Sequence, residues 1–392
     1  MKILFITKEI PYPVNDGCRN RTFNILKGLS KNNNITLICF GNAERDSERI
    51  EGIKGLYSSI KLISQDSYNI RKKSLADVLL GLLSIVPFIV KSRFSGSMKT
   101  AIKEIIETER IDLVFCDSIY QAINMPVSSV TKILSEHNIE SDILYRYFKV
   151  EKNFFKKVYI FIELLKMRIY ESREWKKFDK CIVVSDKDRS AIEKRTKKQS
   201  IIVVPNGVDI EYFQPKKKDE IPNSLIYTGL MSWYPNEDAM TYFLESIYPI
   251  IRREVAVPSL MIVGKDPSDR LKKTASSDRS ITITGTVVDI RPFISESEVF
   301  IVPLRIGSGT RLKILEAMAM GKTIVSTSVG CEGLDVKHDD NILIAKDEED
   351  FAGLTVRALG DAGLRDRIGN AARLFVEKKY SWEELIKILE KI

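Results

Sequence analysis

A cation and a carboxylate three residues apart are the residues of this chain best placed to do chemistry. Lys313 and Glu316 lie in a run whose pattern predicts a helix over residues 311–320. Side chains at this spacing share a helix face, so the ammonium and the carboxylate are expected to meet the same ligand. They follow a glycine loop that allows close backbone approach and ends in a plausible N-cap residue. The loop consists of Gly307, Ser308, Gly309 and Thr310.

The ligand that suits this arrangement is a diphosphate joined to a ribose. A helix N-terminus presents unpaired N–H donors and a partial positive charge, both of which favour phosphate. Arg311 and Lys313 add formal charge at that end, and Glu316 offers an acceptor to a ribose diol. The residues alone leave a simpler alternative open, in which the glycines only turn the chain and Lys313 and Glu316 form a solvated pair.

A strand on each side of this helix is needed to position it. Residues 299–304 are β-branched and aromatic, which predicts a strand buried in a parallel sheet. Gly321 is expected to end the helix, and residues 323–328 predict the next strand. Strand, glycine loop, helix and strand together form a βαβ unit.

The run GTRLKILEAMAMGK resembles the donor-nucleotide motif of GT-B glycosyltransferases of the retaining family 4. That motif has two glutamates with seven residues between them. Glu316 occupies the second position, whereas the first is occupied by Ser308. The family uses the first glutamate on donor-sugar hydroxyls, so the resemblance implies a nucleotide site and leaves the sugar open. The run is characteristic of a branch of the family.

The same resemblance implies further contacts with the donor. Family members carry an arginine and a lysine that clamp the diphosphate after the strand at residues 224–228. This chain has Gly229 there, followed by Met231, Trp233 and Asn236. We therefore expect Arg311 and Lys313 to hold the phosphates. Thr286 and Val287 lie in the segment that resembles the loop whose backbone contacts the nucleobase.

Two residues of the amino-terminal half complete the expected site. Gly17 lies in a loop after the first strand and, by resemblance, borders the donor or acceptor sugar. His137, within SEHNIESD, matches by context the histidine that lines the cleft in this family. Its implied role is to hydrogen-bond the donor sugar or orient the acceptor. From the residues alone, a turn glycine and a structural histidine remain the alternatives.

The order of strands and helices predicts an α/β fold of two Rossmann-like domains facing across a cleft, the GT-B arrangement. A chain of 392 residues, 44% hydrophobic and 29% charged, is long enough for two cores. We expect an acceptor-side domain over residues 1–208 and a nucleotide-sugar-binding domain over residues 209–377. Residues 378–392 are expected to form a C-terminal helix that crosses back to the first domain.

No metal or other cofactor is expected. Asp186 and Asp188 form a literal DxD, but Ser185 ahead of them predicts an N-cap with acidic residues in the first helical turn. No cysteine or histidine cluster has the spacing of a zinc site. The five cysteines are odd in number and widely separated, which indicates buried thiols in a reducing cytoplasm.

The net charge of +8 suits anionic partners. Residues 75–90 are apolar with basic flanks, although Asp77 and Pro87 interrupt them and argue against a membrane span. Residues 146–168 alternate aromatic and basic side chains. Either segment is expected to pack in the fold or to rest on an anionic membrane surface. The location would then be cytoplasmic, peripheral on the inner face of the membrane. Dispersed lysines and the absence of a recognition motif argue against nucleic acid.

These expectations converge on a glycosyltransferase that moves a sugar from a UDP- or GDP-linked donor to a cell-envelope glycan or lipid-linked acceptor. Arg311, Lys313 and the helix N-terminus would stabilise the charge of the departing diphosphate. Retention of configuration without a metal is what the family implies. Two alternatives stay open, namely a nucleotide-sugar epimerase of the same fold and a non-catalytic nucleotide-sugar-binding subunit of a polysaccharide assembly complex.

Overall fold

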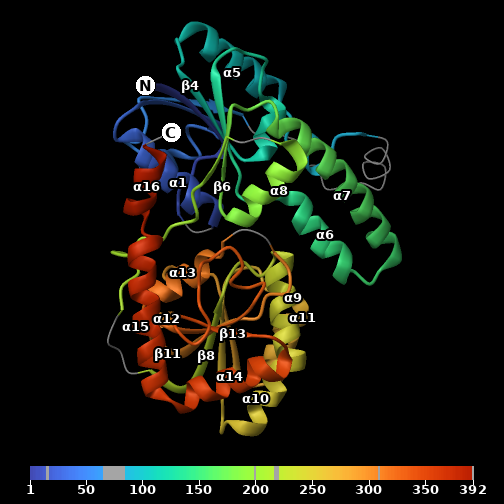
Figure 1. Cartoon of the computed structure of the whole chain (residues 1–392), viewed down its shortest axis with the longest axis vertical. Helices are drawn as coiled ribbons and strands as arrows, with labels where there is room; N and C mark the ends of the chain where they lie inside the picture. The colour runs from blue at the N-terminus through green and yellow to red at the C-terminus, as the bar shows by residue number, and fades with distance from the viewer. Residues whose placement is uncertain (15–16, 65–83, 198–199, 216–219, 308–309, 391–392) are drawn as a thin grey trace. The chain divides into compact units, whose positions relative to one another are not determined.

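The computed structural model describes residues 1–14, 17–64, 84–197, 200–215, 220–307 and 310–390. The chain divides into two compact units (Figure 1). The first comprises Met1–Pro205 and Ile386–Ile392, and the second comprises Asn206–Leu385. The boundary predicted from the sequence lies three residues later, after residue 208, and the predicted return to the first unit is at residue 378. The structure puts that return inside helix α16 (Trp382–Leu389).

Within the described residues, the first unit is built on seven parallel strands in the order β3-β2-β1-β4-β5-β6-β7. The strands are β1 (Lys2–Glu9), β2 (Asn34–Phe40), β3 (Ser59–Ile63), β4 (Leu113–Asp117), β5 (Thr131–Ser135), β6 (Lys180–Val183) and β7 (Ile201–Val203). The helices are α1 (Gly17–Ser30), α2 (Ser47–Glu51), α4 (Phe88–Lys91), α5 (Gly96–Thr108), η2 (Ile119–Asn124), α6 (Glu140–Val150), α7 (Phe154–Trp175) and α8 (Asp186–Thr196).

The second unit repeats the plan with six parallel strands in its described part, in the order β10-β9-β8-β11-β12-β13. The strands are β8 (Ile221–Thr228), β9 (Ser259–Val263), β10 (Ile281–Gly285), β11 (Ser297–Val302), β12 (Thr323–Thr327) and β13 (Leu343–Ala345). The helices are α9 (Tyr234–Tyr242), η3 (Phe243–Ile247), α10 (Tyr248–Glu254), α11 (Asp269–Ser277), α12 (Arg291–Glu296), α13 (Leu312–Ala319), α14 (Glu348–Gly360) and α15 (Ala362–Lys379).

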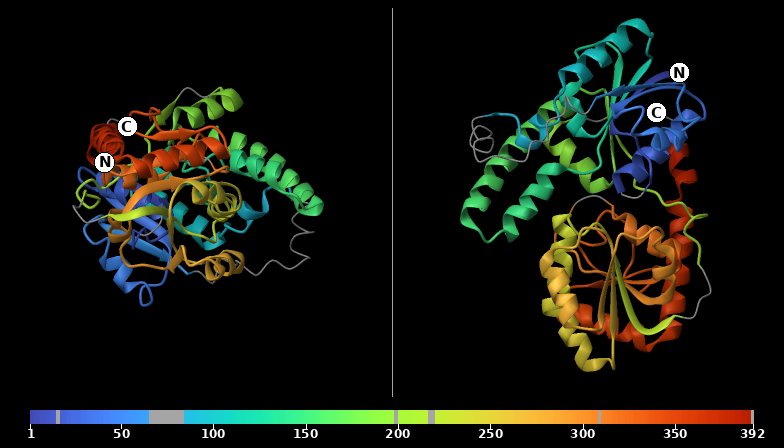
Figure 2. Two further views of the ribbon diagram at one scale, coloured as in Figure 1. Left: turned by 90° about the horizontal axis from the view of Figure 1, so that it is seen from below. Right: turned by 180° about the vertical axis from the view of Figure 1, so that it is seen from behind.

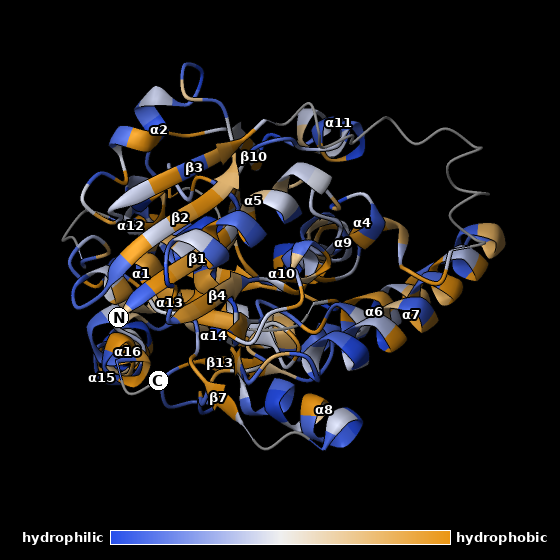
Figure 3. Cartoon of the chain, turned by 90° about the horizontal axis from the view of Figure 1, so that it is seen from above, coloured by the Kyte–Doolittle hydropathy of each residue, from blue (hydrophilic) through white to orange (hydrophobic). Residues whose placement is uncertain are grey.

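The strands are apolar because helices cover both faces of each sheet (Figure 2). Strand β1 has five consecutive buried residues, and β11 has four. Figure 3 shows the same contrast, with apolar strands inside and polar residues spread over the outer helices. The predicted α/β class with two Rossmann-like units is therefore confirmed.

Each sheet reverses its strand order once, and this reversal determines where ligands bind. In the first unit β1 lies between β2 and β4, and in the second β8 lies between β9 and β11. The connections leave the two central strands in opposite directions. In open α/β sheets, ligands bind beyond the carboxyl ends of the strands at this switch point.

Several local expectations can be compared directly with the fold. Ser185 is the N-cap of α8 and accepts a hydrogen bond from the backbone N–H of Asp188, so the predicted capping role is confirmed. Gly321 has a φ of +69° just after α13, as expected for a glycine that ends a helix. Cys18 is exposed, which corrects the expectation of buried thiols. The other four cysteines are buried, namely Cys39, Cys116, Cys181 and Cys331.

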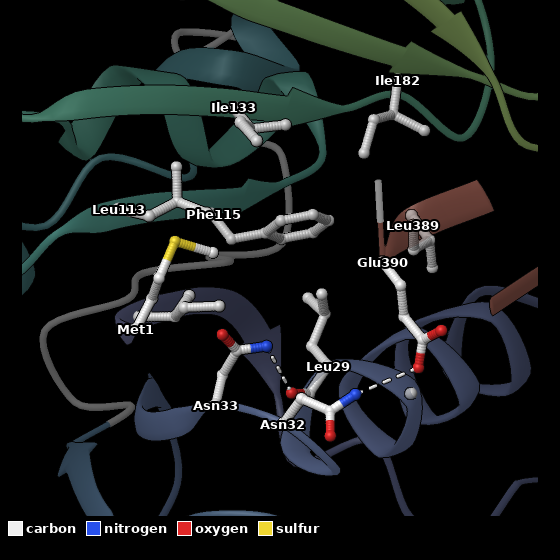
Figure 4. A pocket seen from close by; sticks show the side chains of 12 residues that line it. Met1, Leu29, Asn32, Asn33, Leu113, Phe115, Ile133, Ile182, Leu389 and Glu390 are labelled. Carbon is white, nitrogen blue, oxygen red and sulfur yellow. Dashed lines mark hydrogen bonds between the residues drawn. The ribbon is translucent and has the colours of Figure 1, made fainter. Parts of the chain in front are cut away.

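A small pocket lies at the amino-terminal edge of the first sheet, away from its switch point (Figure 4). Its volume is about 120 Å³, and Phe115, Leu29 and Leu389 supply much of its apolar wall. Asn32 Nδ2 donates a hydrogen bond to Glu390 Oε1 at 3.2 Å beside it. Sites for drug-sized ligands are usually about 300 Å³ or larger, so this pocket is a packing gap beside α16.

Part of the apolar run at residues 75–90 lies outside the described residues, which resume at residue 84. Its end forms the single turn α4. In the part of the chain that the structure describes, no helix combines the length and apolarity needed to cross a membrane.

Candidate functional site

The predicted phosphate-binding residues lie at the switch point of the second unit. Gly229 directly follows β8, and Gly307 and α13 follow the neighbouring strand β11. The two loops therefore start at the same edge of the sheet. Ser308 and Gly309, between β11 and α13, lie outside the described residues.

Lys313 extends from α13 to the loop that follows β8. Its Nζ donates a hydrogen bond to Asn236 Oδ1 at 3.0 Å and lies 3.9 Å from the centre of the Tyr227 ring. The Tyr227 hydroxyl donates to the same Asn236 oxygen at 2.6 Å, and Asn236 Nδ2 donates to the Leu230 carbonyl at 2.8 Å. These bonds fix the amide of Asn236, so the ammonium is held in one place.

Two glycines make room for this arrangement. A Cβ on Gly229 would lie 2.9 Å from both Lys313 Nζ and Asn236 Nδ2. A Cβ on Gly264, just after β9, would lie 1.7 Å from the Gly229 carbonyl oxygen, which no rearrangement of side chains relieves. The Gly229 N–H donates to the Val263 carbonyl at 2.9 Å. The end of β9 thus supports the loop that meets Lys313.

Burial perturbs both charged groups of α13. The surrounding protein, together with the Arg311 guanidinium, holds the pKa of Lys313 well below its usual value. Burial raises the pKa of Glu316 to about 7, against the opposing effect of Lys313. Both side chains are half-buried, whereas a solvated surface pair would be exposed. Strong perturbation of this kind clusters at functional sites.

The start of α13 differs from the prediction. Arg311, not Thr310, occupies the N-cap position, and the helix spans Leu312–Ala319. Thr310 is buried, and its hydroxyl accepts a hydrogen bond from the Asn206 N–H at 3.3 Å, which takes it away from the helix. Among the described residues, no side chain caps the first turn of α13. Gly307 packs against Arg311, since a Cβ there would lie 2.4 Å from Arg311 Nη2.

Thr286 and Val287 lie farther along the same edge of the sheet, beyond the end of its outermost strand. They follow β10, the outermost strand, which β9 and β8 separate from β11. Thr286 is exposed, whereas Val287 packs partly against the core. Adjacent strands are about 4.8 Å apart, so these residues are roughly 10 Å from the end of β8.

In the first unit, the switch point carries a buried acid and a histidine. Asp117 is the last residue of β4, and His137 follows β5. His137 Nε2 lies 2.7 Å from Asp117 Oδ1. The other carboxylate oxygen accepts hydrogen bonds from the Thr22 hydroxyl at 2.6 Å and the Thr7 hydroxyl at 3.3 Å. Asp117 is thus fixed on both sides.

This pair keeps His137 in its charged form. Burial alone would lower the pKa of His137, but the Asp117 carboxylate outweighs burial and raises it to about 10. Burial would likewise raise the pKa of Asp117, but His137, Thr22 and the nearby Arg21 hold it below its usual value. At neutral pH His137 is an imidazolium, which donates hydrogen bonds and accepts none.

Gly17 and the arginines after it occupy α1. Gly17 is the first residue of that helix and is exposed, so it belongs to the helix instead of the loop before it. Arg19 forms an ion pair with Glu9 at 2.7 Å. Arg21 is buried, and its Nη1 donates to the Pro205 carbonyl at 3.1 Å. Arg21 is therefore a buried structural residue.

Three residues of these sites were missed by the sequence analysis as site residues. Asp117 ends the buried run LVFCD, and a carboxylate at the carboxyl end of a buried strand is the pattern that marks it. Tyr227 lies within an apolar strand and has no such pattern. Asn236 was noticed only as a replacement in the usual clamp region. Its contact with Lys313 joins residues 77 positions apart, which a local pattern does not predict.

The chemistry available is the binding and stabilisation of anions. The second unit presents Lys313, Arg311 and an uncapped helix start, and the first presents a charged imidazole. Among the described residues, no three histidines, cysteines or carboxylates are grouped as a metal site would require.

Comparisons with known proteins cover nearly all of the chain. A family model described as Glycosyltransferase Family 4 matches residues 16–212, and one described as Glycosyl transferases group 1 matches residues 222–361. An uncharacterized 44.6 kDa protein in the cps region of Klebsiella pneumoniae is 25% identical, over 100% of this chain and 99% of that protein.

Two further proteins extend the comparison. A UDP-Gal:alpha-D-GlcNAc-diphosphoundecaprenol alpha-1,3-galactosyltransferase of Escherichia coli is 27% identical over 46% of this chain and 51% of that enzyme. The crystal structure of Anabaena HepE in complex with UDP and glucose matches with a TM-score of 0.71 at 14% identity, over 100% of this chain and 98% of that chain. The structural likeness shows the GT-B fold.

Proposed function

The chain belongs to the family 4 glycosyltransferases, and from this we propose that it transfers a sugar from a UDP-sugar to a lipid-linked acceptor of the cell envelope. One observation carries the proposal most directly. The ammonium of Lys313 is held between Asn236 and Tyr227 at the switch point of the second unit. That is where an open α/β sheet binds its ligand.

The diphosphate of the donor is the partner we propose for Lys313. Burial disfavours the charged form of the Lys313 ammonium, and a nearby anion stabilises that form. Binding of a diphosphate would therefore raise the pKa that burial lowers. Arg311 and the uncapped first turn of α13 add positive potential. These groups stabilise negative charge as it develops on the departing diphosphate. They take the place of the arginine and lysine that usually follow β8.

Glu316 is proposed to accept hydrogen bonds from the ribose hydroxyls. It lies one turn along α13 from Lys313, and its pKa of about 7 means that the carboxyl is about half ionised at neutral pH, while its carbonyl oxygen accepts hydrogen bonds in either form. We assign Gly229, Gly307, Ser308, Gly309 and Thr310 to the loops around the diphosphate, and Thr286 and Val287 to the nucleobase. These assignments rest on the resemblance to the family and, for the residues that the structure describes, on their common sheet edge.

His137 is proposed to donate a hydrogen bond to the donor sugar or to the acceptor. Its charged form is unsuited to removing a proton, because no lone pair is available on the imidazolium. A donor role agrees with retention of configuration, in which the leaving diphosphate and the acceptor meet the sugar on the same face. Gly17 is assigned to the same region by resemblance.

We propose UDP as the donor nucleotide instead of GDP, and a lipid-linked acceptor instead of a free glycan, on the basis of the named relatives. The Escherichia coli enzyme uses UDP-Gal and a sugar on diphosphoundecaprenol, and the HepE structure holds UDP. The similarity to a protein of a cps region agrees with cell-envelope polysaccharide synthesis. We further propose that transfer needs no metal, since Lys313, Arg311 and α13 already supply the positive charge that the leaving group requires.

A transfer assay with the purified chain tests this function. The chain is incubated with radiolabelled UDP-sugars and polyprenyl-diphosphate-linked sugars, with and without EDTA. Label should move into the lipid fraction, and EDTA should leave the rate unchanged. Epimerised or free sugar without lipid product would favour the epimerase, and binding of UDP without turnover of any donor would favour the binding subunit.

A further inference from the structure

The strongest feature that the proposed chemistry does not use is the outer face of α7. Six large apolar residues of this helix are exposed, with exposed fractions from 43% to 83%. They define the α7 stripe, which consists of Phe154, Phe155, Val158, Phe161, Leu165 and Ile169. All but Phe155 recur at steps of three or four residues, so they share one face of the helix.

The stripe lies opposite the face by which α7 joins the first unit. Ile160, Leu164 and Met167 are buried on that inner side. An ordinary surface helix is apolar inside and polar outside, whereas α7 is apolar on both sides over much of its length. Isolated exposed apolar residues need no explanation, but a continuous row of six marks a contact surface.

The exposed charged residues of α7 itself are all basic, and the turn before the helix adds the half-buried Glu151. All residues of α7 are described, and its three carboxylates, Glu163, Glu171 and Glu174, are buried. Lys156 and Arg168 are exposed beside the stripe, and Lys152 is exposed in the turn before the helix. The outward side of α7 therefore combines large apolar groups with cations and lacks exposed acids. That combination is complementary to a surface of anionic headgroups over hydrocarbon.

The neighbouring helix α6 packs against α7 and holds the stripe in place. Figures 1 and 2 show α6 and α7 side by side, extending away from the sheet of the first unit. The Phe148 and Phe161 rings are 5.5 Å apart, and the Arg168 guanidinium lies 5.7 Å from the Tyr145 ring. These contacts join the aromatic and cationic side chains of the two helices.

We propose that the α6–α7 hairpin is a membrane-docking surface, with the α7 stripe inserted into the headgroup region of an anionic lipid bilayer. From Phe154 to Ile169 the stripe runs for about 22 Å along the helix, which suits a helix lying in the plane of the interface. The aromatic residues at the start of α7 enter the boundary between headgroups and acyl chains, while the flanking lysines contact lipid phosphates. A lipid-linked acceptor would then lie at the same membrane surface to which the enzyme is bound.

Vesicle flotation of the full chain tests the proposal. Vesicles of phosphatidylglycerol and phosphatidylcholine in equal parts should carry the protein at about 50 mM salt and much less of it at about 500 mM, because salt screens the lysines. The double variant F154S/F155S should lower the partition coefficient about tenfold or more, since two phenyl groups lose their burial. The charge reversal K156E/K157E should lower it by a similar factor.

Matched controls separate the stripe from general surface effects. The double variant V127S/L374S removes two apolar residues that are 104% and 66% exposed elsewhere, and K99E/K103E reverses two exposed lysines of α5. Both should float like the wild type. Thermal unfolding of every variant should match the wild type, because the altered side chains lie outside the core.

Three outcomes would overturn the proposal. The chain does not float with anionic vesicles at low salt, or F154S/F155S floats as well as the wild type. Alternatively, sedimentation shows a dimer that F154S/F155S dissociates while vesicles bind neither form, which would assign the stripe to a second copy of the chain. The assay contains no sugar donor, so its failure leaves the proposed transfer reaction intact, and a failed transfer assay leaves docking intact.

Discussion

Lys313 and His137 are both cations held by the fold, but opposite surroundings control them. The Lys313 ammonium contacts a neutral amide and an aromatic ring, and burial together with the nearby Arg311 guanidinium lowers its pKa. His137 meets the carboxylate of Asp117 and stays charged. Neither property can be predicted from the sequence, because in each case the partner comes from a different element of the fold.

Replacing Lys313 tests the phosphate assignment. In K313M, we expect UDP to bind about 10- to 100-fold more weakly by calorimetry, since a charge-assisted contact with the diphosphate is lost. The variant should fold at least as stably as the wild type, because methionine fills the site without a desolvated charge. K273M, on the exposed face of α11, is the matched control and should bind UDP normally. Wild-type affinity in K313M would contradict the assignment.

The charge of His137 is testable through pH. The folded pKa of about 10 exceeds the usual 6.5, so the His137–Asp117 contact stabilises the fold fully below pH 6.5 and is lost as the pH rises through 10. Its imidazole NMR signals should therefore not titrate between about pH 6 and pH 9. In D117N the signals should titrate below that range, and turnover should fall as the pH rises.

Assignment of these signals is simple because the chain has only two histidines. H338Q removes the other one, whose Nδ1 accepts a hydrogen bond from the Ile344 N–H in an exposed loop. A wild-type His137 signal that titrates near pH 6.5 would show that Asp117 does not hold the charge.

At the scale of elements, the strands were the most predictable part of the chain. Buried parallel strands are continuous apolar runs, so residues 299–304 and 323–328 predicted β11 and β12 to within two residues at each end. The start of α13 was less predictable. Thr310 has the residue type of an N-cap, but its hydroxyl accepts from Asn206, over one hundred residues away in sequence. A tertiary contact thus overrides a local preference.

The supporting role of β9 gives a prediction at this scale. G264A should destabilise the fold by about 2 kcal/mol or more, because its Cβ would overlap the Gly229 carbonyl oxygen and push the loop away from Lys313. UDP affinity should fall with it. G353A in α14 is the control, since its Cβ meets nothing within 4 Å and should stabilise the helix by roughly 0.5–1 kcal/mol. Equal effects of the two changes in thermal unfolding would refute this role for Gly264.

For the whole molecule, the order of elements was sufficient to predict two Rossmann-like units, because alternating strands and helices allow few other folds. The site was predicted only in part. Lys313, Glu316 and His137 have recognisable neighbours in sequence, whereas Asn236, Tyr227 and Asp117 act through contacts made by folding. The α7 stripe lies in a segment whose alternating aromatic and basic residues are visible in the sequence, but only the structure shows which of them are exposed.

The two units are expected to contribute to different steps. H137A, in the first unit, should lower the transfer rate by about 100-fold while changing the affinity for free UDP less than about threefold, because His137 is proposed to contact sugar or acceptor and not the nucleotide. K313M should lower both the transfer rate and the affinity for UDP. A large loss of UDP affinity in H137A, measured by calorimetry, would show that the roles are not divided in this way.

A crystal structure of the chain with UDP bound tests the central claim most directly. The β-phosphate should lie within hydrogen-bond distance of Lys313 Nζ at the start of α13, with the ribose toward Glu316. Nucleotide bound elsewhere, with Lys313 still held only by Asn236 and Tyr227, would contradict the account.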